Sequence, residues 1–153
     1  MLTYNVGENS QEAGKGRDMK KLIVIHSMET PDDEVMTIDE IVEKRSEERK
    51  GDPMPYHYVI DQRGQIFKTK RDKEVCGHCG RWSGDSLSVA FVGGMYRNTM
   101  TAEQEKAMVF LLKEYRKRFG EIEVRGCNEL MYPEEVMAHE PYFVVSEWWN
   151  ERE

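Results

Sequence analysis

The clearest hydrophobic pattern in the chain is a short apolar run that ends in a histidine. Residues 22–25 are Leu-Ile-Val-Ile, and His26 and Ser27 follow at once. A continuous run of this length, rich in β-branched residues, is typical of a central strand covered on both faces. Pro31 blocks its continuation. Open α/β sheets bind ligands at the carboxyl ends of their strands, so His26 stands where a functional site is expected. A strand-end histidine that only hydrogen-bonds a neighbour is the simpler interpretation.

Two amphipathic helices are predicted, and each begins with a capping box. Thr37 with Glu40 predicts a helix to about residue 49 with a narrow apolar face. Thr101 with Gln104 predicts a second helix, which Gly120 ends. The apolar stripe of the second helix has the spacing of a core face and comprises Met108, Leu111, Leu112, Tyr115 and Phe119.

Segments in which apolar and polar residues alternate, and short apolar runs, predict the other strands. They lie at residues 56–60, 65–69, 87–92 and 122–124, and the first two form a hairpin around a glycine-containing turn. Long connections follow at residues 71–85 and 126–141, and Ser146 is predicted to cap a last short helix. Strands alternate with helices but a hairpin interrupts them. The order therefore predicts an α/β fold with a mixed central β-sheet flanked by helices.

Composition narrows the classes of partner. The 153 residues suggest one domain at residues 19–153, after a polar segment at residues 1–18 that we interpret as a flexible tail or a leftover of cloning. A net charge of −7 argues against nucleic acid as a partner. No apolar run is long enough for a membrane span, and no signal-peptide core is present. We therefore expect a monomer that is cytoplasmic in the cell that makes it.

The histidines and cysteines are distributed unevenly. None lies on a predicted helix face, and all fall at strand ends, in the hairpin or in the two long loops: His26, His57, His78, His139, Cys76, Cys79 and Cys127. Zinc takes imidazole, thiolate and carboxylate ligands from separated segments, so this distribution favours a metal site. Three cysteines without a mark of secretion favour thiols or metal ligands over a disulfide framework. The Cys-x-x-Cys at Cys76 and Cys79 is a weak zinc or redox signal by itself.

Four segments together resemble a known family. They are the strand ending in His26, the Tyr-His-Tyr hairpin at residues 56–66, the block from residue 75 to Gly-Gly at 93–94, and the segments 124–126 and 141–149. Over roughly residues 20–150 they resemble the zinc-dependent N-acetylmuramoyl-L-alanine amidases of the short phage-lysozyme type. That fold is shared with peptidoglycan recognition proteins, and the resemblance implies it here.

The resemblance implies a zinc site whose ligands depart from the family pattern. His26 matches the first ligand. Cys127 stands where the family has histidine, and Glu140 stands where it has cysteine or aspartate. Ala138 replaces a lysine that stabilises the oxyanion in the family. A thiolate donates more charge than imidazole, which makes the metal a poorer Lewis acid.

Three ligand arrangements stay open at the level of sequence. The first is His26, Cys127 and Glu140, and the second replaces Glu140 by His139, which can alternatively stand in for the missing lysine. In the third, Cys76 and Cys79 close a tetrahedral structural site that leaves no position for catalysis.

The resemblance also implies a mechanism. Zinc-activated water cleaves the amide between N-acetylmuramic acid and L-alanine, and Tyr56, with His139 or His78, stabilises the oxyanion. Trp82, Arg81 and Arg97 are candidates for lining the substrate groove. His57 is interpreted as a packed or supporting residue.

Three functions compete on this basis. The first is a peptidoglycan amidase, such as an endolysin, that acts on the cell wall if released. The second is a degenerate amidase fold that binds muropeptides, or binds and inhibits a protein partner. The third is a redox or structural zinc protein built on the Cys-x-x-Cys.

Overall fold

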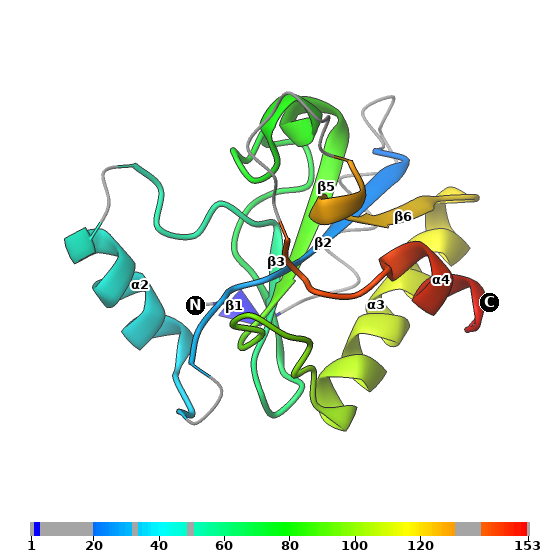
Figure 1. Cartoon of the computed structure of the whole chain (residues 1–153). Coiled ribbons are helices and arrows are strands. Elements are labelled where there is room, and N and C mark those ends of the chain that lie inside the picture. Colours follow the sequence, from blue (N-terminus) through cyan, green and yellow to red (C-terminus); the bar gives the residue numbers. More distant parts are fainter. Residues whose placement is uncertain (1, 4–19, 32–33, 49–50, 131–138, 153) are drawn as a thin grey trace.

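The architecture is a mixed sheet between helices (Figure 1). The computed structural model describes residues 2–3, 20–31, 34–48, 51–130 and 139–152. Its strands are β1 (Leu2–Thr3), β2 (Leu22–Ser27), β3 (Tyr58–Ile60), β4 (Ile66–Lys68), β5 (Ser86–Phe91) and β6 (Glu123–Gly126). Its helices are α2 (Ile38–Glu48), α3 (Ala102–Phe119) and α4 (Val145–Asn150), with 3₁₀ segments η1 (Gly80–Asp85) and η2 (Cys127–Glu129).

The strand order is β1-β4-β3-β5-β2-β6. β2 lies between β5 and β6 and is parallel to both, and β3 is parallel to β5. β4 is antiparallel to β3, and β1 is antiparallel to β4. This confirms the predicted α/β class, the mixed sheet and the buried strand that contains His26.

Alternation along β2 separates two chemically different faces of the sheet. Ile23 and Ile25 point into the main core with Leu87, Val89 and Phe91 of β5. Because side chains in a strand alternate, Leu22, Val24 and His26 point to the other face. In the register of β5 they lie beside Ser86, Ser88 and Ala90. The polar residues of this second face include the buried His26, His57, Ser86 and Ser88.

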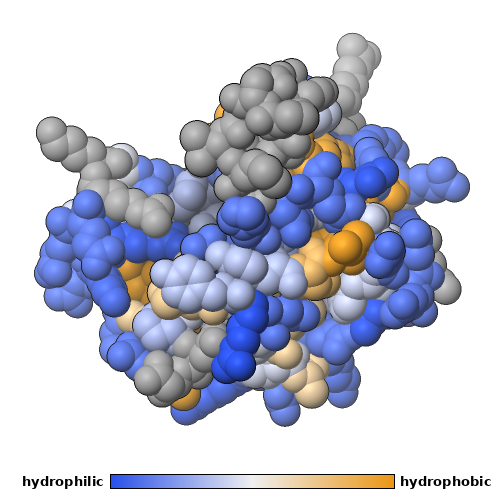
Figure 2. Space-filling view, viewed as in Figure 1, coloured by the Kyte–Doolittle hydropathy of each residue, from blue (hydrophilic) through white to orange (hydrophobic). Residues whose placement is uncertain are grey.

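Helices cover both faces, as Figure 1 shows. α3 and α4 lie together against the apolar face, where Met108, Leu111, Leu112, Val145 and Trp149 complete the main core. α2 lies on the opposite side of the sheet and packs Ile38 and Ile41 against Met28, Val59 and Ala90. On the view in Figure 2 the described surface is mostly hydrophilic, with apolar residues in small separate areas. No helix among the described residues is long and apolar enough to cross a membrane.

Two of the three described helices begin with the capping residue predicted from the sequence. The Thr37 hydroxyl accepts from the Glu40 N–H, and the Glu40 carboxylate accepts from the Thr37 N–H. The same reciprocal pair joins Thr101 and Gln104 at the start of α3. Ser146 does not cap α4, because Val144 holds the N-cap position. The Ser146 hydroxyl instead donates to Glu129, which ties α4 to the segment after β6.

The predicted tail is mostly outside the described residues. Leu2 and Thr3 form β1 and pair with Lys68 and Phe67 of β4. The assignment of residues 1–18 to a flexible tail and of residues 19–153 to one domain stays a prediction.

Gly94 supports the end of β2 and provides a test of this packing. It has φ +70, and a Cβ there would collide with Cβ and Oγ of Ser27, which follows His26. Gly51 has φ +104 but open space where a Cβ would stand. A left-handed backbone costs an alanine about 1–2 kcal/mol, and overpacking adds about 1–3 kcal/mol. We expect Gly94→Ala to lower the free energy of unfolding by about 3 kcal/mol and Gly51→Ala by about 1 kcal/mol. Equal losses in urea titrations would show that Ser27 is not tightly held.

Candidate metal and catalytic site

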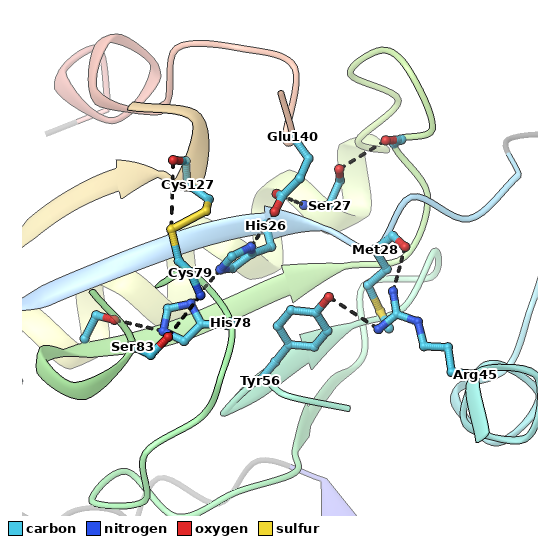
Figure 3. Close-up of polar contacts among 12 residues, drawn as sticks. His26, Ser27, Met28, Arg45, Tyr56, His78, Cys79, Ser83, Cys127 and Glu140 are labelled. Carbon is cyan, nitrogen blue, oxygen red and sulfur yellow. Dashed lines mark hydrogen bonds and ion pairs between the residues drawn. A yellow bond between two sulfur atoms is a disulfide. The ribbon is translucent and has the colours of Figure 1, made fainter. Parts of the chain in front are cut away.

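Three side chains from distant segments meet on the polar face of the sheet (Figure 3). His26 comes from β2, Cys127 follows β6 directly, and Glu140 lies before α4. Their ligand atoms all lie within 4.8 Å of one another. In the part of the chain that the structure describes, no other group of three histidine, cysteine or acidic residues meets this criterion. The first of the three arrangements considered from the sequence is therefore the one whose ligand atoms converge.

Two contacts hold Glu140 in place. Its Oε1 accepts from the backbone N–H of Ser27 at 3.0 Å, and its Oε2 lies 2.6 Å from Nδ1 of His26. The backbone of the same residue accepts from the Asn128 N–H at 3.2 Å. The carboxylate is thus fixed by β2 and by the segment that carries Cys127. A glutamate in place of the shorter aspartate still reaches His26.

A hydrogen-bonded chain leads away from the other side of His26. Nε2 of His26 lies 2.7 Å from Nδ1 of His78, and Nε2 of His78 lies 2.8 Å from Oγ of Ser86. The Ser86 hydroxyl donates to the carbonyl of Trp82 at 2.6 Å. Because a carbonyl only accepts, the single Ser86 hydrogen is committed and His78 must donate to Ser86 through Nε2. Burial first, and then the proximity of His26, lower the pKa of His78 to about 2, so its ring is neutral.

This chain fixes which ring nitrogen of His26 faces Glu140. A neutral His78 that donates through Nε2 accepts at Nδ1, so Nε2 of His26 carries the hydrogen between the two rings. Nδ1 of His26 is then the atom that faces Oε2 of Glu140 at 2.6 Å. That separation is a hydrogen-bond distance, and zinc, which stands about 2.0–2.2 Å from nitrogen and oxygen ligands, requires the two atoms to move apart. The imidazole, the carboxylate and the nearby sulfur of Cys127 are donor types that zinc takes.

Tyr56 lies beside His26 and is held from behind by Arg45 of α2. The ring centroids of Tyr56 and His26 are 5.4 Å apart. Nη1 of Arg45 donates to the Tyr56 hydroxyl at 3.3 Å, and Nη2 donates to the Met28 carbonyl at 2.8 Å. The sequence alone gives Arg45 no role. A cation four residues after Ile41, on the buried side of a helix, is the signal that marks it.

A cleft of about 420 Å³ opens onto these residues. Tyr56, His78 and Glu140 line it, together with Lys44, Arg45 and Glu48 of α2. Three methionines contribute apolar, adaptable wall surface and are Met28, Met36 and Met95. The cleft therefore offers charged groups of both signs and a flexible apolar wall beside the converging ligands.

The sequence prediction of reduced cysteines is wrong for one pair. Cys79 and Cys127 form a disulfide, although they are 48 residues apart in sequence. Both are buried and pack with Leu22 and Val24 at the start of β2. Sequence reasoning weighed Cys79 only with its near neighbour Cys76. Only the register of β2 with β6, and the loop folded over β5, bring Cys79 to Cys127.

Cys76 belongs to a different cluster, so the Cys-x-x-Cys does not act as a unit. Sγ of Cys76 lies 3.5 Å from Nε2 of His57, which donates to the Glu74 carbonyl at 2.7 Å. Nδ1 of His57 accepts from the Ser88 N–H at 3.0 Å. Burial raises the pKa of the Cys76 thiol to about 11, so it stays protonated at neutral pH. Joint ligation of a structural zinc by Cys76 and Cys79 is not the arrangement found, and His57 is a packed, fully hydrogen-bonded residue as expected.

Three of the remaining predicted site residues, His139, Trp82 and Arg97, are not among those that line the cleft. The His139 side chain is exposed and outside the group of converging ligands. Trp82 is half-buried, and its Nε1 donates to the Leu130 carbonyl at 2.8 Å. Arg97 is exposed, and neither it nor Trp82 lines the cleft. The side chain of Arg81 and all of Ala138 are outside the described structure, so their roles stay predictions.

Comparison with known proteins agrees with this fold. The sequence matches the family model described as N-acetylmuramoyl-L-alanine amidase over residues 16–151. No curated protein gives a significant match.

Solved structures with the same fold come from two kinds of protein. The endolysin LysCS from Clostridium intestinale URNW, named an N-acetylmuramoyl-L-alanine amidase, has TM-score 0.66 and 16% identity over 82% of this chain and 76% of that one. The Ph2119 endolysin of a Thermus scotoductus bacteriophage has TM-score 0.63 and 23% identity over 78% and 79%. Human PGRP-IBETAC, in complex with glycosamyl muramyl pentapeptide, has TM-score 0.66 and 11% identity over 85% and 81%. At these identities the likeness shows the fold.

The His57 cluster predicts a pH dependence of stability. Burial lowers the pKa of His57 to about 4 from an ordinary 6.5. Below pH 6.5 the unfolded chain therefore binds a proton that the folded chain does not, so stability falls as the pH drops from 6.5 to 4, by up to about 3 kcal/mol. Gln in place of His57 cannot titrate, so we expect His57→Gln to be less stable at pH 7 but to lose less stability in that window. Urea titrations at several pH values measure the difference, and parallel curves for the two proteins would refute the assignment.

Proposed function

The chain belongs to the N-acetylmuramoyl-L-alanine amidase family, and from this membership we propose that it is a peptidoglycan hydrolase. The proposed reaction is cleavage of the amide between N-acetylmuramic acid and L-alanine by zinc-activated water, on cell wall that the protein reaches after release. The observation that carries the proposal is the convergence of His26, Cys127 and Glu140 beside Tyr56, where Glu140 and Tyr56 line a cleft. The peptidoglycan recognition protein among the structural neighbours, which holds a muramyl pentapeptide, supports a muropeptide as the ligand class.

The three converging residues are the proposed zinc ligands. His26 offers Nδ1, Glu140 offers Oε2, and Cys127 offers its sulfur once the bond to Cys79 is reduced. One imidazole, one carboxylate and one thiolate leave a fourth position open, as in catalytic zinc sites. When bound, zinc supplies a Lewis acid and an activated water. The net charge of this donor set is more negative than that of two histidines and one cysteine, so we expect tighter metal binding and weaker Lewis acidity.

His78 is proposed as a positioning residue for His26. Metal-ligating histidines donate their second ring N–H to a partner that fixes the tautomer and the ring orientation. Here Nε2 of His26 donates to His78, which donates to Ser86, which donates to the Trp82 carbonyl. Each member of the chain has a defined donor and acceptor, so Nδ1 of His26 is left for the metal. Both ring nitrogens of His78 are engaged in this chain, which argues against the oxyanion role considered from the sequence.

Tyr56 is the proposed oxyanion donor. Its ring lies against His26, and Arg45 donates to its hydroxyl oxygen. An accepted hydrogen bond from a cation polarises the phenol and strengthens donation by its own O–H. Arg45 is itself fixed by the Met28 carbonyl, so the phenol is held before substrate arrives. The position taken by lysine in the family is Ala138, and Tyr56 with Arg45 would carry a larger share of the charge stabilisation here.

A binding module without hydrolysis is the second candidate. The observation that favours it is the Cys79–Cys127 disulfide, which removes the Cys127 thiolate from the ligand set. In this function the cleft binds a muropeptide or a segment of a protein partner, and no amide is cleaved. Release of stem peptide from muropeptides distinguishes the two functions directly.

Hydrolysis by the reduced, zinc-loaded protein is the central prediction. We expect release of a stem peptide that begins with L-alanine, which chromatography and mass spectrometry detect. Tyr56→Phe should lower kcat by about 100-fold or more, because it removes an oxyanion donor. Tyr58→Phe is the matched control, since the Tyr58 hydroxyl donates to Asp72 in another cluster, and its kcat should stay near wild type. No release by wild-type protein that holds one zinc would leave the binding module as the better description.

Metal affinity tests the positioning role of His78. Loss of such an outer partner typically lowers metal affinity by about 10–100-fold. We expect this loss for His78→Leu. His78→Gln offers a donor and an acceptor on one side chain and should retain more of the affinity. Zinc titration against a chromophoric chelator measures both under reducing conditions, and equal affinity of His78→Leu and wild type would exclude the role.

A further inference from the structure

One sulfur atom takes part in two incompatible arrangements. Sγ of Cys127 is bonded to Cys79, and the same atom lies within 4.8 Å of the ligand atoms of His26 and Glu140. Cys79 is not a member of that ligand group. The disulfide thus occupies one ligand of the metal position and leaves the other two untouched.

We propose that the Cys79–Cys127 pair is a thiol–disulfide exchange site that switches the metal position between three ligands and two. This inference rests on the metal position of the proposed function. In the oxidising direction the two protein thiols and one glutathione disulfide give the protein disulfide and two molecules of glutathione. Cys79 and Cys127 lose two electrons and two protons, and the glutathione disulfide gains them. In the reducing direction a thiol reagent reverses these steps and frees Cys127.

Charge makes the two arrangements exclusive. The metal ligand is the thiolate, and a disulfide sulfur carries no negative charge. In the oxidised chain the metal position therefore offers one imidazole and one carboxylate, which is short of the three protein ligands of a catalytic zinc site. Reduction adds a thiolate beside Nδ1 of His26 and the Glu140 carboxylate, which completes the three ligands.

The surroundings of the pair suit both states. The Cα atoms of Cys79 and Cys127 are 6.0 Å apart. A reduced Cys79 has an acceptor at hand, because its Sγ lies 3.9 Å from the Cys127 carbonyl. Both residues are buried and pack with Leu22 and Val24. Cys76 lies in the separate cluster with His57 and is the one cysteine outside the exchange.

Linkage gives the switch a second, reciprocal signature. If reduction raises the affinity for zinc by some factor, zinc must raise the stability of the reduced form over the oxidised form by the same factor. Zinc therefore protects the pair from oxidation. Because both cysteines are buried, exchange is expected to be slow, and measurements belong at equilibrium.

The test compares full-length wild-type protein in two redox states without any substrate. One sample is equilibrated with glutathione disulfide and one with a phosphine reductant, and excess reagent is removed. Under denaturing conditions a thiol-reactive dye should find one free thiol in the first and three in the second, since the chain has three cysteines. Titration with Zn²⁺ against a chromophoric chelator should then give an affinity at least about 100-fold higher for the reduced sample. Loss of a direct ligand should lower the affinity by more than loss of a residue that only hydrogen-bonds a ligand, which typically costs about 10–100-fold. Equal affinities would overturn the proposal.

Three variants separate the roles of the cysteines. Cys79→Ser should bind Zn²⁺ tightly in both redox states, because Cys127 has lost its partner. Cys127→Ser should bind weakly in both. Cys76→Ser is the matched control and should keep the wild-type redox dependence. A redox dependence that survives in Cys79→Ser would also overturn the proposal. Circular dichroism checks the fold, and the wild-type comparison stands if a variant does not fold.

The reciprocal measurement needs only wild-type protein. In a glutathione buffer that leaves about half of the chains oxidised, added Zn²⁺ should shift most chains to the thiol form, whereas Mg²⁺, which prefers oxygen ligands, should not. An unchanged thiol count in Zn²⁺ would contradict the linkage.

Zinc affinity and thiol counts do not depend on catalysis. A redox-dependent zinc affinity without peptide release would refute the proposed hydrolase function and leave the thiol–disulfide switch supported. Equal peptide release by the oxidised and reduced samples would refute the switch and leave the hydrolase function supported.

Discussion

The parallel register of β2 with β5 is the constraint on which the rest of the structure depends. Pairing Leu22 with Ser86 and His26 with Ala90 sends Ile23, Ile25, Leu87 and Val89 to one side. That side is continuously apolar and buries α3 and α4. A shift of one residue would exchange the faces and bury His26 in the main core. The cost of burying an imidazole without partners therefore helps to fix the register that also builds the site.

The second face divides into two apolar patches with a polar strip between them. Leu22, Val24, Cys79 and Cys127 form one patch, and the cluster under α2 forms the other. His26 lies between, with partners on both ring nitrogens. His26 and Ser86 in this chain are buried, so their polar groups must find partners inside the protein. These hydrogen bonds fix the ring of His26 so that Nδ1 faces Glu140.

Local sequence signals were sufficient for several elements, and the family resemblance grouped the three candidate ligands. Capping boxes at Thr37 and Thr101 and the run before His26 predicted three elements correctly, because each rests on interactions within a few residues. The family resemblance grouped His26, Cys127 and Glu140, whose ligand atoms converge. Contacts that depend on how distant loops fold over the sheet were not predicted from the sequence. Cys79 was weighed only with its near neighbour, and the hydroxyl of Ser146 was assigned to its own helix although it reaches Glu129.

The position of Arg45 follows from the same distinction between local and long-range signals. Its place on the apolar side of α2 is a local fact, but its role depends on Met28 and Tyr56, which lie on other elements. A guanidinium that is only 8% exposed needs several acceptors to offset its desolvation, and the carbonyls of Met28 and Pro53 with the Tyr56 hydroxyl supply them. Tyr56 therefore lies between the guanidinium of Arg45 and the ring of His26. Because carbonyls on other segments fix Arg45, the fold sets the orientation of the phenol beside His26 before any ligand binds.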